Sequence, residues 1–255
     1  MPIVKTLKRY FAGRKSFPDD YERILYNRVR VWSRLNSQRK RLLKERMKIF
    51  MSEKIFEECG GLRLTTEMKV VISAYACVLI LEEPSDYYPG LQSILVYPDD
   101  YIAPVYEHNP GGIITEGNER RQGESWESGN VVLSWADIER TTLSGKNNQN
   151  LVVHEFAHQL DMQYGLSGGI TLEGEVLKGG DEWTMELAKT YRKLVDLERF
   201  GREDDLLDIY GAANPSECFA VIMEAFLESP RELSIKYSRL YRMLSDFFKL
   251  DPERW

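Results

Sequence analysis

The segment VVHEFAHQLDM, residues 152–162, restricts the fold more than any other part of the sequence. His154 and His158 stand four residues apart, so on an α-helix both imidazoles leave the same face, one turn above the other. The residues around them are mostly apolar, which predicts that this helix is buried. A buried helix that carries two histidines and Glu155 needs partners for these polar side chains. The fold must therefore place a helix in its interior with a polar site on one face.

A metal ion is the partner that this spacing favours. Two imidazoles placed in this way converge on a point that zinc can occupy, with nitrogen ligands about 2 Å away. Glu155 lies beside that point and can accept a proton from a water that the metal activates. The pattern H-E-x-x-H on a helix is typical of zinc metalloproteases. The alternative is a pair of surface or hydrogen-bonded core histidines. We favour one zinc ion per chain, bound by His154 and His158, with Glu155 as the general base.

A third protein ligand is expected, because catalytic zinc sites usually have three protein ligands and one open position. The remaining histidine, His108, lies in the sequence YEHNPGG, where we expect a loop or surface position. The longer motif H-E-x-x-H-x-x-G-x-x-H is absent, since Asp161 and Tyr164 stand where its glycine and last histidine would be. We therefore expect the third ligand to be a carboxylate from a later helix.

The segment NPSECFAVIMEAFLE, residues 214–228, carries the best candidates for this carboxylate. Asn214 and Pro215 predict the start of a helix whose faces are almost entirely apolar. Its polar exceptions, Glu217, Glu224 and Glu228, are spaced seven and four residues apart and form one stripe. The Glu217 side chain could bind the metal or serve in a capping box with Asn214, and its position leaves both open. Other acids also compete, namely Glu173, Glu175 and Glu182.

The order of predicted elements indicates an α+β fold, mostly helical with a small mixed sheet in the middle. Helices are expected over residues 19–35, 37–58 and 65–81, and again near residues 147–164, 180–200, 216–228 and 231–249. Two apolar runs, SILVY at 93–97 and GNVVLSW at 129–135, have the composition of strands. We expect the second run to be an edge strand that could align an extended peptide through Val131, Val132, Leu133 and Ser134.

Charge is distributed unevenly along the 255 residues. Residues 1–50 hold 15 lysines and arginines against 4 acids, whereas the whole chain has a net charge of −6. A basic arm can bind nucleic acid or an acidic partner. The favoured interpretation is a solvated helical face that packs on an acidic body, so we do not expect direct nucleic-acid binding.

The sequence also bears on location. Its longest apolar stretch, VVISAYACVLILEEP, is shorter than the roughly 20 residues of a membrane-spanning helix. The N-terminus lacks the pattern of a signal peptide. Cys59, Cys77 and Cys218 are far apart and form no CxxC pair, which indicates reduced thiols. We therefore expect a cytoplasmic protein without membrane association.

Three blocks, HEFAHQLD, YGAANPSECFAV and ESGNVVLSW, resemble the Mlc titration factor A family of zinc peptidases, and the likeness covers most of the chain. The resemblance implies a zincin-like metallopeptidase fold. It implies that His154, His158 and Glu217 bind the zinc and that Glu155 is the catalytic base. We expect residues 1–62 to form a basic helical region on a catalytic domain at 63–255, in one compact unit.

Further residues could support this site. The resemblance extends to the lethal factor-like metallopeptidases, which share a tyrosine seven residues before the third ligand. Here that residue is Tyr210, whose hydroxyl could stabilise the oxyanion formed at the substrate carbonyl, or whose ring could cap the helix start. Asp161 could accept a hydrogen bond from a ligand imidazole, or it could be an exposed carboxylate. Glu224 is a weaker candidate for the same supporting role.

The implied function is zinc-dependent hydrolysis of a peptide or protein substrate, with aminopeptidase activity as one form and a regulatory role. Family members in enteric bacteria also bind the glucose repressor Mlc and remove it from its operators. The alternative function is therefore that of a binding protein that sequesters a transcriptional repressor of the Mlc type, with peptidase activity secondary.

Overall fold

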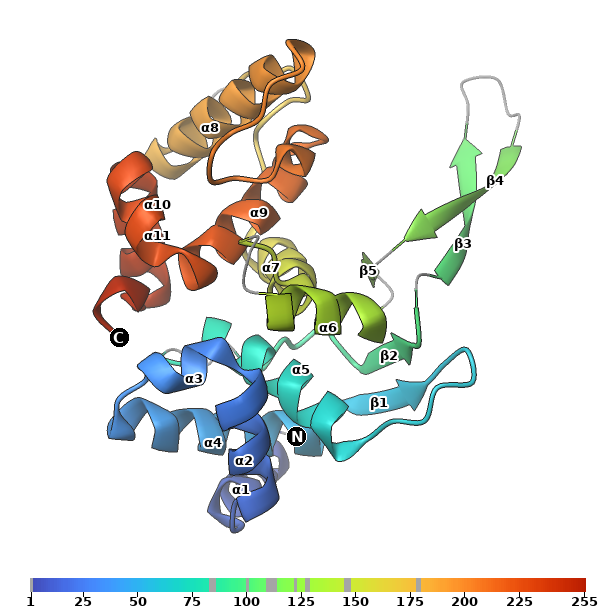
Figure 1. The fold of residues 1–255 in the computed structure, drawn as a ribbon, viewed down its shortest axis with the longest axis vertical. Helices are drawn as coiled ribbons and strands as arrows, with labels where there is room; N and C mark the ends of the chain where they lie inside the picture. The colour runs from blue at the N-terminus through green and yellow to red at the C-terminus, as the bar shows by residue number, and fades with distance from the viewer. Residues whose placement is uncertain are drawn as a thin grey trace.

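The computed structural model describes residues 2–255 apart from 83–85, 100, 109–113, 122, 127–128, 145–147 and 178–179. Helices dominate, and a small mixed sheet lies in the middle of the chain, so the expected fold class is confirmed. Figure 1 shows the N-terminal helices on one side of helix α7 (Leu151–Tyr164) and the C-terminal helices on the other. Among the described residues, no helix has both the length and the apolar character needed to cross a membrane.

Helices α1 (Pro2–Arg14), α2 (Asp19–Arg28), α3 (Arg30–Arg34) and α4 (Ser37–Glu53) form the N-terminal region. The helix expected over 19–35 is divided at Val29, whose extended backbone (φ −118°, ψ 96°) interrupts it. The helix expected to reach residue 58 ends at Glu53, so that prediction was wrong at its end. Residues 55–58 instead form strand β1 (Ile55–Glu58), which pairs with strand β2 (Ser93–Tyr97).

The main sheet has the strand order β1-β2-β6-β5. Strands β1, β2 and β6 (Asn130–Ser134) run parallel, with Ile94 opposite Val131, and β5 (Gly123–Trp126) is antiparallel to β6. Strand β6 is therefore paired on both sides, and its expected position at the edge was wrong. The structure places β5 at that edge.

A separate antiparallel pair consists of β3 (Tyr101–His108) and β4 (Ile114–Arg121). His108 is the last residue of β3 and lies opposite Ile114 in the register, so of the expected loop or surface position the loop was wrong. Its side chain lies outside the described part of the structure.

The core surrounds α7, which packs against α5 (Thr66–Leu79), α9 (Pro215–Glu228) and strands β5 and β6. One continuous apolar cluster joins Leu43 and Phe50 of the N-terminal region to Phe156 of α7 and Phe226 of α9. The remaining elements are α6 (Trp135–Ser144), which the sequence did not predict, and α8 (Glu182–Arg199), η1 (Ile209–Ala212), α10 (Pro230–Lys236), α11 (Ser238–Phe248) and η2 (Pro252–Arg254).

Candidate metal centre

Both ends of α7 are set by local chemistry. The Asn150 side chain accepts a hydrogen bond from the Val153 N–H (3.2 Å) and caps the helix start, as asparagine commonly does. Gly165 ends the helix with a left-handed backbone (φ 67°), which a glycine adopts without steric cost. His154 therefore leaves the first turn of α7, and His158 lies one turn further along the same face.

Glu217 reaches this face from the first turn of α9. Asn214 caps that helix by accepting a hydrogen bond from the Glu217 N–H (3.0 Å). The Glu217 side chain points to the histidines, with Oε2 lying 2.9 Å from His154 Nε2 and 3.4 Å from His158 Nε2. One ligand atom from each of the three residues lies within 4.8 Å of the others. Of the two interpretations left open for the Glu217 side chain, this geometry favours metal binding.

The donor set fits a metal ion. Two imidazole nitrogens and one carboxylate oxygen are a common ligand set for catalytic zinc. Glu155 follows the first histidine and is buried, and its Oε2 has no hydrogen-bond partner among the described residues. A buried carboxylate oxygen without a partner is costly unless it serves a function. The site thus combines three side chains that could hold a metal ion with an adjacent group that can accept a proton.

The buried histidines and carboxylates of the centre shift one another's pKa values. Burial opposes protonation of His154, but hydrogen bonds with Glu217 and Glu224 outweigh it and raise its pKa well above the ordinary value. Burial also disfavours the charged form of Glu217, yet hydrogen bonds from His154 and His158 lower its pKa to about 2. Desolvation raises the pKa of Glu155 to about 7, although both histidines act in the opposite direction.

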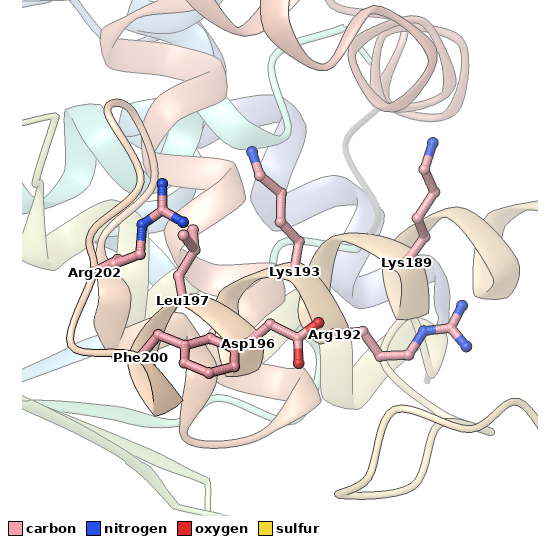
Figure 2. Close-up of a pocket in the computed structure, with 7 residues that line it drawn as sticks. All are labelled: Lys189, Arg192, Lys193, Asp196, Leu197, Phe200 and Arg202. Carbon is pink, nitrogen blue, oxygen red and sulfur yellow. The ribbon is translucent and has the colours of Figure 1, made fainter.

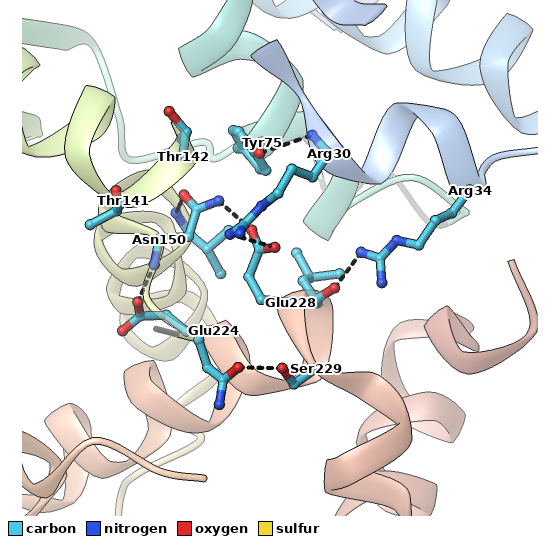
Figure 3. A network of polar contacts seen from close by, with 12 residues as sticks. Arg30, Arg34, Tyr75, Thr141, Thr142, Asn150, Glu224, Glu228 and Ser229 are labelled. Atoms are coloured by element: carbon cyan, nitrogen blue, oxygen red, sulfur yellow. Dashed lines mark hydrogen bonds and ion pairs between the residues drawn. The ribbon is translucent and has the colours of Figure 1, made fainter. Parts of the chain in front are cut away.

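His154 Nδ1, the ring nitrogen that does not contact Glu217, has a carboxylate partner. His154 Nδ1 lies 2.8 Å from Glu224 Oε1, and the second Glu224 oxygen accepts a hydrogen bond from the Asn150 N–H (Figure 3). Glu224 is buried, and desolvation raises its pKa. With a proton on Nδ1, the imidazole would be able to present its Nε2 lone pair to a metal ion. The sequence had ranked Glu224 below Asp161 for this contact.

The outer nitrogen of His158 has a different partner. His158 Nδ1 lies 3.0 Å from Ser216 Oγ, and this hydroxyl donates a hydrogen bond to Asp161 Oδ2 (2.8 Å). Asp161 also accepts a hydrogen bond from the Ser167 N–H (2.6 Å) and is buried. Neither expectation for Asp161 was correct, because it is not exposed and it reaches the imidazole only through Ser216. Sequence reasoning missed Ser216, although it directly precedes Glu217.

Tyr210 lies in η1, just ahead of α9. Its ring centroid is 6.1 Å from that of His154, with an angle of 39° between the rings, and the residue is 57% exposed. The η1 turn is capped by Asp208, which accepts a hydrogen bond from the Tyr210 N–H (2.9 Å). The tyrosine is thus close to the metal-binding face and accessible to a substrate from solvent.

The other predicted residues lie elsewhere. Residues 131–134 of β6 are buried, which agrees with the interior position of this strand. Glu182 forms an ion pair with Arg239. Within the part of the chain that the structure describes, His154, His158 and Glu217 form the one group of three histidine, cysteine or acidic side chains that could hold a metal ion. Glu173 and Glu175 are not part of it, so the structure does not support them as the third ligand.

A separate pocket of about 550 Å³ lies along α8 and the segment after it (Figure 2). Lys193 in this pocket is paired with Asp204 at 2.7 Å. No residue of the metal centre lines it. Its lining is mainly basic and consists of Lys189, Arg192, Lys193, Asp196, Leu197, Phe200 and Arg202.

Comparison with known proteins relates the chain to a family of metallopeptidases. The sequence model of the family described as glucose-regulated metallo-peptidase M90 matches residues 4–249. An uncharacterized protein of Synechocystis sp. is 34% identical over 239 residues, which covers 93% of this chain and 86% of that protein. Mlc titration factor A of Serratia proteamaculans is 32% identical over 205 residues (79% of this chain, 76% of that protein). The Yersinia pestis protein of the same name is 31% identical over 212 residues (80% and 77%).

Proposed function

The chain belongs to the glucose-regulated metallo-peptidases of family M90, and from this premise we propose that it is a zinc-dependent peptidase. The convergence of one ligand atom each from His154, His158 and Glu217 within 4.8 Å is the observation that carries the proposal. These three residues hold the metal. When bound, zinc supplies Lewis-acid polarisation of a water and of the substrate carbonyl. Family membership implies a metal ion and a peptide or protein substrate, and zinc is our choice because of the ligand set.

Glu155 is the general base in this proposal. It is buried beside both histidines and its Oε2 has no hydrogen-bond partner among the described residues, so it can accept a proton from a water at the metal site. It takes a proton from the water that attacks the peptide carbonyl, and it delivers that proton to the amine as the C–N bond breaks. Tyr210 donates a hydrogen bond to the carbonyl oxygen as negative charge develops there. Its exposed position beside His154 supports this role.

The strand that we propose for substrate alignment is β5, whereas the sequence had suggested residues 131–134 of β6. The main sheet has two edge strands, β1 and β5, and an extended peptide could add to the outer edge of β5. Strand β5 also contacts α7, which carries the metal-binding histidines. We therefore propose β5, in place of residues 131–134, as the strand that aligns the substrate backbone.

The test is hydrolysis of a peptide mixture by the zinc-loaded protein, read by mass spectrometry beside the Glu155→Gln variant. Cleavage by the wild type alone is expected, because an amide in place of the carboxylate cannot take the proton while the metal ligands are unchanged. The fragment ends would separate aminopeptidase trimming from internal cleavage. Absence of cleavage by a wild type with confirmed bound zinc would contradict the peptidase proposal.

A second function is favoured by the relatives named Mlc titration factor A, at 31–32% identity. We propose that this protein can also sequester a transcriptional repressor of the Mlc type, in the cytoplasm, where its free cysteines would remain reduced. Binding of purified repressor to both the wild type and Glu155→Gln would support a regulatory role that is separable from catalysis. A repressor that binds neither form would contradict it.

A further inference from the structure

The first turn of α7, which carries His154, is held by contacts from other elements. The Asn150 N–H donates to Glu224 of α9, and the Leu151 N–H donates to Thr141 Oγ1 of α6 at 3.5 Å (Figure 3). Free N–H groups at a helix start need such acceptors. The position of the imidazole therefore depends on where these partners hold Asn150.

Asn150 is fully buried and uses both ends of its side-chain amide. Oδ1 caps Val153, whereas Nδ2 donates to Glu228 Oε1 at 2.6 Å. Glu228 Oε2 in turn lies 2.9 Å from Arg30 Nη2 of helix α3. The Glu228 side chain is only 5% exposed, and that of Arg30 is 32% exposed. A continuous series of polar contacts thus runs from Arg30 to Glu224, as Figure 3 shows. Glu224 in turn contacts His154 Nδ1.

The stripe of acids on α9 organises this series. Glu217 contacts both histidines, Glu224 contacts His154 and the Asn150 N–H, and Glu228 contacts the Asn150 amide and Arg30. Removing the Arg30 guanidinium would leave the buried Glu228 carboxylate without its ion-pair partner, and only the more distant charge of Arg34 would remain. That carboxylate would then form hydrogen bonds with other donors, and its hydrogen bond from Asn150 Nδ2 would be lost. Ligand positions tolerate displacements of only about 0.5 Å in a working site.

We propose that Arg30 is a positioning residue of the metal centre, acting through Glu228, Asn150 and Glu224 to hold His154 in its ligand orientation. The inference rests on the proposed function, since it takes His154 as a metal ligand. It assigns a role to the basic N-terminal region beyond packing. A purely structural ion pair between α3 and α9 would stabilise the fold but would leave metal affinity unchanged.

The experiment measures zinc affinity by competition with a chromophoric chelator, together with the visible spectrum of the cobalt-substituted protein. Arg30→Gln should weaken zinc binding about tenfold and alter the cobalt spectrum, as loss of support for a ligand does. Arg30→Lys should restore part of the affinity. Arg39→Gln is the matched control. The Arg39 side chain is 26% exposed, and its Nε lies 2.9 Å from Glu82 Oε1, an ion pair that is not part of this series of contacts. This variant should bind zinc with an affinity close to that of the wild type.

Glu228→Gln provides a second route to the same test if Arg30→Gln does not fold. It keeps an oxygen for the Asn150 amide but removes the charge, and it should also weaken zinc binding. The effects of the two substitutions should not add in the double variant, because both break one series of contacts. Thermal unfolding of the metal-free variants separates metal affinity from general stability.

The outcomes separate the two proposals. A wild type that binds no zinc, or whose affinity is unaffected by His154→Ala, would contradict the proposed metal centre. A wild type that binds zinc through His154, with Arg30→Gln and Glu228→Gln each equal to it in affinity and cobalt spectrum, would overturn the positioning role alone.

Discussion

His154 and His158 are supported from behind by different chemical groups. A buried carboxylate contacts His154 Nδ1 directly, whereas a serine hydroxyl lies between His158 and Asp161. A carboxylate increases the basicity of an imidazole more than a neutral hydroxyl does, because it stabilises positive charge on the ring. The two ligands should therefore contribute unequally to metal affinity.

Glu224→Gln tests this inequality. The amide can still accept a hydrogen bond, but it carries no charge, so zinc affinity should fall about tenfold or more. Ser216→Ala should have a smaller effect, because the substitution removes a neutral partner of His158. Chelator competition measures both variants. A larger loss for Ser216→Ala than for Glu224→Gln would contradict the expected inequality.

Metal binding should release protons near neutral pH. Hydrogen bonds with Glu217 and Glu224 raise the pKa of His154 well above its ordinary value, so the metal-free protein holds a proton there at pH 7. A cation displaces that proton and also lowers the pKa of Glu155, which is about 7 without it. Zinc affinity should therefore increase as the pH rises from about 6 to 8. Calorimetry in buffers of different ionisation enthalpy measures the release, and identical heats in all buffers would contradict it.

The residues of H-E-x-x-H could be predicted because their geometry is local to one helix. Helix periodicity alone brings His154 and His158 to one face. The partners behind them could not be assigned, because they depend on how α7 packs against α9. Ser216 and Glu224 lie 58 and 70 residues away from the histidines that they contact. A sequence pattern does not show which residues of two helices far apart in the chain will lie opposite each other.

At the scale of elements, predictions failed where tertiary pairing decides the structure. Residues 55–58 continue a helical pattern, yet they form β1 because β2 offers a parallel partner. The propensity of a short segment is weak compared with the hydrogen bonds of a sheet. The position of β6 inside the sheet was missed for the same reason, since its neighbour β5 has no strong apolar run of its own.

The close approach of η1 to α9 gives a prediction about Tyr210. A Cβ at Gly211 would lie 2.6 Å from Val221 Cγ2, 2.9 Å from Leu194 Cδ1 and 3.3 Å from Cys218 Cα. Gly211→Ala must therefore displace these atoms, and we expect η1 to move away from α9. We expect stability to fall by about 1–3 kcal/mol. Because Tyr210 moves with η1, kcat should decrease more than zinc affinity does. Urea unfolding, peptide hydrolysis and chelator competition measure the three quantities.

Gly90→Ala is the control for this prediction. Among the described residues, no atom lies within 4 Å of a Cβ at Gly90, so stability and activity should remain close to those of the wild type. A Gly211→Ala variant with unchanged kcat would show that the position of Tyr210 does not matter for turnover.

At the scale of the whole molecule, ion pairs within the fold neutralise part of the excess positive charge of the N-terminal helices. Arg9 pairs with Asp86, and Arg39 pairs with Glu82, so two arginines of the N-terminal region contact acids beyond residue 62. These contacts favour the interpretation of a basic helical face packed on an acidic body. The division of the chain at residue 62 stays a prediction.

A truncated chain that begins at residue 63 should not fold independently. The deletion removes β1 from the main sheet and removes Leu43, Met47 and Phe50 from the continuous apolar core. The loss of several fully buried side chains exceeds the stability of a typical domain, which is about 5–15 kcal/mol. Circular dichroism and thermal unfolding of the truncated chain test this. A cooperative transition together with zinc binding would show that residues 63–255 are an autonomous unit.

The stripe of acids on α9 has a consequence for sequence drift and for protein engineering. The helix from Glu217 to Glu228 spans about 16 Å, and each inserted residue would rotate the later part of the helix by about 100°. A single insertion or deletion between Glu217 and Glu224 would therefore turn the Glu224 and Glu228 carboxylates away from His154 and Asn150, while Glu217 would keep its position. Helix α9 should tolerate apolar substitution but no change in length, and grafting this centre into another scaffold would require the whole helix as one piece.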